Sequence, residues 1–111
     1  MNQETQNKLL QAKLIPVFYE QDKQKCLRIT RACYEGGVQA IEYLNRGEAA
    51  LQNFPEIVEH TRKNFPGFLI GAGSVLSSAQ SEEFIARGAD IIVSPILSMQ
   101  IAEVCIKHNV Y

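Results

Sequence analysis

The sequence predicts an α/β fold in which parallel strands alternate with helices. Three observations indicate it: short apolar runs recur along the chain, segments with helical apolar spacing separate them, and glycine or proline marks most of the junctions. Such alternation implies right-handed crossovers. It fits an open doubly wound sheet or part of a (β/α)8 TIM barrel. Because a complete barrel usually takes more than about 200 residues, this 111-residue chain is expected to form about the first half, as one domain over residues 1–111.

The first strand and helix are predicted between residues 14 and 37. The run "LIPVFY" (14–19) suits a strand buried on both faces, although Pro16 removes one donor from the ladder. Asp22 is placed to cap a helix over 23–35, in which apolar residues recur at helical spacing. The "GG" that follows is a helix stop.

The second and third strands are predicted at 38–44, "VQAIEYL", and 68–72, "FLIGA". The segment between them, 48–64, is interpreted as a helix in two parts, because Pro55 is tolerated in the first turn of a second part. "FPG" at 65–67 closes that helix.

The last part of the chain is predicted to hold two more helices and one more strand. Ser78 is placed to cap a helix over 77–88. "IIVS" at 91–94 is the expected fourth strand, and 99–108 the expected fourth helix. Val110-Tyr111 then begins a further apolar run, the start of a fifth strand.

Composition and charge argue against several classes of protein. The net charge is −1 and no basic stripe runs along the chain, so no nucleic-acid partner is expected. No apolar stretch approaches the ~20 residues that span a bilayer, and the polar start is no signal peptide, so no membrane partner is expected either. Cys26, Cys33 and Cys105 lack metal-ligand spacing, which indicates reduced core residues of a cytoplasmic protein without a metal.

Polar residues gather at the carboxyl ends of the predicted strands, where parallel α/β sheets place their chemistry. Arg46 would hold a carboxylate, Ser74 of "GAGSV" would donate a hydrogen bond to it, and Glu42 would move protons. Such a set suits a small anionic substrate. A partly buried Glu42–Arg46 ion pair without function fits the same residues. Three neighbours are interpreted as ordinary rim residues: Tyr19, Asn45 and Glu48.

Four segments in register resemble one enzyme family. "LIPVF", "GGVQAIEYLNRG", "IGAGSVL" and "ADIIVSP" are together similar to motifs of the 2-keto-3-deoxy-6-phosphogluconate and 4-hydroxy-2-oxoglutarate aldolases, over about residues 9–111. The resemblance implies a (β/α)8 barrel, usually a homotrimer, and a class I aldolase that needs no cofactor. In that chemistry a lysine forms a Schiff base with pyruvate, whose iminium stabilises the carbanion left by carbon–carbon cleavage as an enamine.

The resemblance also assigns roles to five residues. Glu42 matches the proton-transfer glutamate, and Arg46 matches the arginine that helps hold the pyruvyl carboxylate. Gly73 and Ser74 match a Gly-Thr pair of the substrate site, with the serine keeping the hydroxyl. Pro95 matches the proline of a Ser-Pro-Gly motif, although the residue after it is not the usual glycine.

The family's Schiff-base lysine is expected on a sixth strand, in a segment resembling K-F-F-P, whereas the last residues here begin a fifth strand. Three hypotheses follow. The chain is the amino-terminal portion of an aldolase and inactive alone, or a half-barrel that associates with itself or with a separate second half, or a non-catalytic domain that binds small carboxylates. The expected partners are a keto acid with a pyruvate moiety and further copies of the chain.

Overall fold

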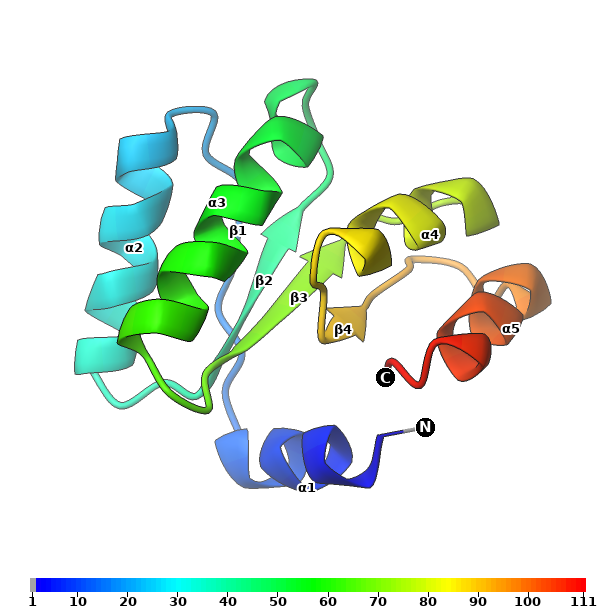
Figure 1. Cartoon of the computed structure of the whole chain (residues 1–111), viewed down its shortest axis with the longest axis horizontal. Coiled ribbons are helices and arrows are strands. Elements are labelled where there is room, and N and C mark those ends of the chain that lie inside the picture. Colours follow the sequence, from blue (N-terminus) through cyan, green and yellow to red (C-terminus); the bar gives the residue numbers. More distant parts are fainter. Residues whose placement is uncertain (1) are drawn as a thin grey trace.

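The computed structural model describes residues 2–111, which form one parallel sheet with helices around it (Figure 1). The strands are β1 (Val17–Phe18), β2 (Ala40–Leu44), β3 (Leu69–Gly73) and β4 (Ile91–Ile92). The helices are α1 (Gln3–Ala12), α2 (Lys23–Glu35), α3 (Ala49–Asn64), α4 (Ser78–Ala86) and α5 (Met99–Lys107). Within the described part of the chain, none of these helices has both the length and the apolar character that crossing a membrane requires.

The order of the strands distinguishes the two architectures that the sequence allows. Neighbouring strands are parallel and follow one another as β1-β2-β3-β4, with one helix after each strand. A doubly wound sheet reverses its strand order at a switch point, whereas a (β/α)8 barrel adds its strands in sequence. The arrangement is therefore that of the first four strands of a barrel.

The two faces of the sheet differ in their packing. Ile41 and Tyr43 of β2 and Ile70 of β3 face the helices, where they form the main core with residues of α2, α3 and α4. Side chains alternate along a strand, so Glu42 lies on the opposite, concave face, level with Gly71 of β3. In a complete barrel this face lines the interior, and the site lies where its strands reach their carboxyl ends.

The sequence-based expectations omit α1, which covers the amino ends of the strands (Figure 1). Its residues are mostly polar and only Thr5 is buried, so it has no strong apolar pattern. The Asn2 side chain caps it by accepting hydrogen bonds from the amides of Glu4 and Thr5, at 3.0 and 3.2 Å. Leu9 then packs on a small cluster of concave-face residues: Ala40, Leu69 and Ile91.

The first strand is shorter and more exposed than expected. The prediction of a strand over 14–19 that is buried on both faces is wrong, because β1 has two residues and Val17 is 53% exposed. β1 lies at the edge of the sheet, so it lacks a neighbour on one side and a covering layer on the concave face. β4 is likewise limited to two residues of the predicted 91–94.

Two helix predictions also need correction. α3 is one continuous helix with Pro55 inside it, not a helix in two parts. Phe54 and Ile57, both fully buried, hold the segments on either side of the proline against the same core. The cap of α4 is Ser77, not Ser78, and its hydroxyl accepts a hydrogen bond from the amide of Gln80.

Tyr111, where the start of a fifth strand is expected, lies outside the four strands but is hydrogen-bonded to the backbone of the β4 segment. Its amide donates to the Asp90 carbonyl at 3.4 Å, and the Ile92 amide donates to the Tyr111 carbonyl at 2.9 Å. This pair of bonds places Tyr111 opposite Ile91 in parallel register. The edge of β4 is thus able to accept another parallel strand.

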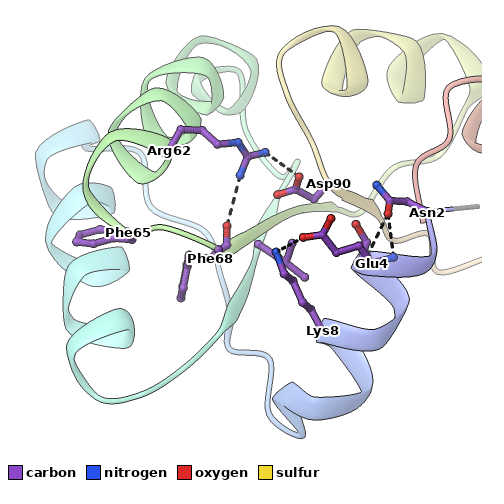
Figure 2. A pocket seen from close by; sticks show the side chains of 10 residues that line it. Asn2, Glu4, Lys8, Arg62, Phe65, Phe68 and Asp90 are labelled. Carbon is purple, nitrogen blue, oxygen red and sulfur yellow. Dashed lines mark hydrogen bonds and ion pairs between the residues drawn. The ribbon is translucent and has the colours of Figure 1, made fainter.

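A charged clamp ties the amino ends of β3 and β4 to α3 (Figure 2). Asp90 accepts a hydrogen bond from the Ile70 amide at 2.9 Å and pairs with Arg62 at 2.7 Å. Arg62 also donates to the Gly88 carbonyl at 3.1 Å and, more weakly, to the Phe68 carbonyl at 3.4 Å. These bonds therefore fix the start of β3 and the start of β4 relative to α3.

We expect Asp90→Ala to lower the free energy of unfolding by about 1–3 kcal/mol, because it leaves the Ile70 amide and Arg62 without their acceptor. Urea unfolding followed by circular dichroism measures the change. Glu4→Ala is the matched control: it breaks an exposed helical pair with Lys8 and should cost no more than about 0.5 kcal/mol. Equal losses of unfolding free energy in Asp90→Ala and Glu4→Ala would contradict the role of the clamp.

Candidate active site

Glu42 is positioned by the centre of β2 and not by the loop that follows it. The residue is the third of the strand and pairs in register with Gly71. Arg46 follows two residues after the strand ends, and the Asn45 amide donates to the Gly73 carbonyl at 2.8 Å. That bond continues the β2–β3 ladder beyond the strand and guides the chain toward β3.

Gly73 makes room for the Glu42 carboxyl group. A Cβ added at position 73 would lie 2.7 Å from Glu42 Cδ and would overlap Oε1. Because Gly73 stands two residues further along β3 than the register partner of Glu42, the Glu42 side chain extends toward the carboxyl end of the sheet. The resemblance assigns Gly73 to the substrate site, and the structure shows a glycine that accommodates the Glu42 side chain. The period-2 placement of Gly71 and Gly73 was the signal for this role.

The Glu42 carboxyl group is half-buried and forms no ion pair within residues 2–111. The interpretation of Glu42 and Arg46 as a structural ion pair is therefore wrong. Burial raises the pKa of Glu42 above its ordinary value. A carboxyl group with a raised pKa and no fixed counter-ion is better suited than an ordinary surface carboxylate to accept and return a proton.

Arg46 and Ser74 come together at the rim, as the sequence predicted. Arg46 Nε donates to Ser74 Oγ at 3.3 Å. Ser74 adopts a left-handed backbone conformation with φ of 56° directly after β3, which sets the position of its hydroxyl. The Nη groups of Arg46 have no hydrogen-bond partner in the described part of the chain, and its side chain is exposed. They remain available for a carboxylate, which a guanidinium binds with two parallel bonds.

Pro95 lies in the exposed loop between β4 and α5. The Val75 amide donates to the Val93 carbonyl at 3.2 Å, so this loop starts beside the segment that carries Ser74. A contribution of Pro95 to substrate binding remains a prediction.

The opposite end of the sheet offers a cavity of a different kind. A cavity of about 280 Å³ lies between α1 and the starts of β3 and β4 (Figure 2). Its charged groups are already paired with one another, Lys8 with Glu4 at 2.9 Å and Arg62 with Asp90 at 2.7 Å. A carboxylate would have to break one of these pairs, whereas Arg46 at the other end has no acidic partner within residues 2–111.

Metal binding finds no support in the described residues, 2–111. No group of three His, Cys, Asp or Glu side chains is placed there to hold an ion.

Comparison with known proteins identifies the family to which this chain belongs. The sequence profile of an aldolase family, described as KDPG and KHG aldolase, matches residues 5–111. The chain belongs to this family. KDPG is 2-keto-3-deoxy-6-phosphogluconate, and KHG is the 4-hydroxy-2-oxoglutarate of the sequence resemblance. The resemblance found from the four motifs is thus confirmed.

Members of the KDPG and KHG aldolase family are similar to the chain over almost its whole length. The 2-dehydro-3-deoxy-phosphogluconate aldolase of Haemophilus influenzae is 31% identical over 102 residues, which are 92% of this chain and 46% of that protein. The KDPG aldolase of Legionella pneumophila, solved with pyruvate as a covalent carbinolamine, is 26% identical with a TM-score of 0.74, covering 86% of this chain and 45% of that one.

A further aldolase structure confirms the fold. The 2-keto-3-deoxy-6-phosphogluconate aldolase of Zymomonas mobilis ZM4 superposes with a TM-score of 0.82 at 23% identity, covering 99% of this chain and 50% of that chain. The chain spans about half the length of the curated relatives it matches. The four-stranded sheet is therefore half of a TIM barrel of this family.

The raised pKa of Glu42 has a consequence for stability. Glu42 holds its proton more tightly in the folded chain, so the free energy of unfolding falls as pH rises from the ordinary value near 4.5 through the raised pKa. We expect Glu42→Gln to unfold at higher urea than the wild type at pH 7, with the difference closing below about pH 4.5.

Urea unfolding across this pH range measures the effect. Glu103→Gln, an exposed position on α5, is the control and should stay within about 0.5 kcal/mol of the wild type. A Glu42→Gln variant that is less stable at pH 7 than at pH 4, relative to the wild type, would contradict the burial of a charged carboxylate.

Proposed function

We propose that this chain is the amino-terminal portion of a class I aldolase that cleaves KDPG or KHG into pyruvate and an aldehyde. One observation carries the proposal: Glu42, with a raised pKa and no ion-pair partner in the described chain, shares the carboxyl end of the sheet with the Arg46–Ser74 pair. The membership of the chain in the KDPG and KHG aldolase family supports the same reaction. Three free cysteines support a reducing, cytoplasmic location.

Each of the three groups has a role in this reaction. Arg46 binds the pyruvyl carboxylate and Ser74 donates a hydrogen bond to it. Glu42 removes the proton of the substrate hydroxyl, and the electron pair of the breaking carbon–carbon bond flows into an iminium to give an enamine. The aldehyde leaves, and Glu42 returns a proton to the enamine carbon. Pro95 would line the same site from the loop between β4 and α5.

The iminium must come from a lysine outside this half-barrel. All six lysines lie in helices or at a helix end: Lys8, Lys13, Lys23, Lys25, Lys63 and Lys107. The four strands, of which β2 carries Glu42, contain none. The isolated chain therefore holds the proton-transfer and carboxylate parts of the site without the electron sink, and we expect it to be inactive alone.

A chimera tests the proposal. Residues 9–111 replace the matching segment of the Haemophilus influenzae relative, so that the second half of that enzyme supplies the lysine. We expect the chimera to cleave KDPG and to be trapped by pyruvate with borohydride, whereas the isolated chain gains no mass. Glu42→Gln in the chimera should lower kcat by about 10²–10⁴-fold, the usual contribution of a positioned acid or base. Glu103→Gln is the control.

Three outcomes would each overturn one part of the proposal. A stable borohydride adduct on the isolated chain would place the nucleophile among its own lysines. A folded chimera that is trapped with pyruvate, and in which Glu42→Gln leaves kcat unchanged, would show that Glu42 takes no part in the reaction. Saturable pyruvate binding by the chain, combined with a folded chimera that never turns over, would favour a carboxylate-binding domain.

Exposed apolar side chains favour a second candidate, a half-barrel that associates with further copies of itself. Val17 on the concave face is 53% exposed, and Leu97, Met99 and Ile106 around α5 are 94%, 64% and 63% exposed. A groove of about 260 Å³, which Leu97 and Ile106 help to line, is formed mostly by apolar residues of α5 and the segments on either side of it. Surfaces of this kind are usually covered by a partner.

We expect light scattering to show the isolated chain as a dimer or larger species, because association covers these side chains. Leu97→Glu should shift the distribution toward monomer by placing a charge in the contact. Glu103→Lys, an exposed change of charge on α5, should leave it unchanged. A monodisperse 12.4 kDa wild-type species would rule out the self-associating half-barrel.

A further inference from the structure

A buried hydrogen-bond network holds the loop that follows β1. The Tyr43 hydroxyl donates to the Glu20 carbonyl at 2.8 Å, and Asn53 Nδ2 donates to the Gln21 carbonyl at 2.8 Å. Cys26 Sγ donates to the same Glu20 carbonyl at 3.1 Å. Tyr43 and Cys26 are fully buried and Asn53 is 8% exposed. Two successive carbonyls of a surface loop are therefore fixed by side chains from β2, α2 and α3.

Tyr19 stands directly before this anchored pair. Its ring packs on the ring of Tyr43, with centroids 5.9 Å apart. Its phenol end lies against the backbone of Gly47, where an added Cβ would come within 2.6 Å of Tyr19 Cζ and would overlap the hydroxyl. The contact joins the loop after β1 to the turn after β2, two segments far apart in the sequence. It also explains why position 47 carries no side chain.

The turn that Tyr19 supports is the one that carries Arg46. On one side of Arg46, the Asn45 amide is bonded to the Gly73 carbonyl at 2.8 Å. On the other side, the Gly47 carbonyl accepts from the Ala50 amide at 3.1 Å at the start of α3. Neither bond restrains the turn from the direction of β1. The Tyr19 ring supplies that third restraint, and Arg46 is left able to reach the hydroxyl of Ser74.

We propose that Tyr19 is a positioning residue for Arg46. The Tyr43–Asn53 network fixes the loop that carries Tyr19, the Tyr19 ring supports Gly47, and Arg46 is thereby kept at Ser74. This inference deepens the proposed function and rests on it, since the restraint serves carboxylate binding by Arg46. The sequence-based interpretation of Tyr19 as an ordinary rim residue is thus replaced by a role that acts through another side chain.

Nuclear magnetic resonance of the unliganded chain tests the positioning directly. The Nε–Hε signal of Arg46 reports its bond to Ser74, and the exposed Arg28 provides a reference signal. In Tyr19→Ala we expect the Arg46 signal to move toward that of Arg28 and its exchange with water to become several-fold faster. Tyr19→Phe keeps the ring on Gly47 and should retain the wild-type signal.

Pyruvate titration of the same samples gives a second readout. We expect Tyr19→Ala to raise the dissociation constant about tenfold, the effect of one impaired hydrogen bond to a charged group. Tyr34→Ala is the matched control, because it removes another partly exposed ring, stacked on Phe65 with centroids 4.5 Å apart at the other end of the sheet. It should lower stability without changing the Arg46 signal or pyruvate affinity.

The outcomes separate this inference from the proposed function. A folded Tyr19→Ala chain with the wild-type Arg46 signal and exchange rate would overturn the positioning role. If that variant does not fold, Tyr19→Leu replaces it, since leucine keeps apolar bulk but does not reach Gly47, and an unchanged Arg46 signal again overturns the inference. Absence of pyruvate binding by the wild type, with the Arg46 signal responding as expected, would count against the proposed reaction alone.

Discussion

The Glu42 carboxyl group lies where a side chain at position 73 would be, and the rest of the site depends on that arrangement. Because β3 presents glycine at this point, an acidic side chain of β2 can extend along the concave face instead of turning into solvent. It is half-buried there, which raises its pKa. The same register brings the turn after β2 against β3, so that Arg46 meets Ser74.

The two faces of the sheet have different roles: one packs against the helices to form the core, and the other carries Glu42. The helix-facing side holds the large buried residues, among them Tyr43, Phe54 and Phe84, and is packed as a complete core. Among the described residues, the concave side has a small apolar cluster with Leu9 at its amino end. Nearer the carboxyl end lie glycines, Glu42 and partly exposed valines. A charged group with a perturbed pKa is tolerated on the second face because close packing does not fill it.

The helix-facing core also reaches the site indirectly. Tyr43 follows Glu42 on β2 and points the other way, toward Asn53 of α3 and the carbonyl of Glu20. One strand thus carries the acid on one face and the anchor of the neighbouring loop on the other. Stability and site geometry are coupled through this strand, since a change in the core at Tyr43 is transmitted to the loop that supports Gly47.

The sequence by itself determined the order of strands and helices and the cap at Asp22, because apolar period and capping chemistry are local properties. It also placed Arg46 and Ser74 at one end of the sheet, because the carboxyl ends of parallel strands lie at the same edge. Only the tertiary structure decided the helix before residue 13, the continuity of α3 through Pro55, the space that Gly73 leaves for Glu42, and the contact of Tyr19 with Gly47. Each of these is set by packing between segments distant in the chain, and packing outweighs the weak local preferences that a sequence displays.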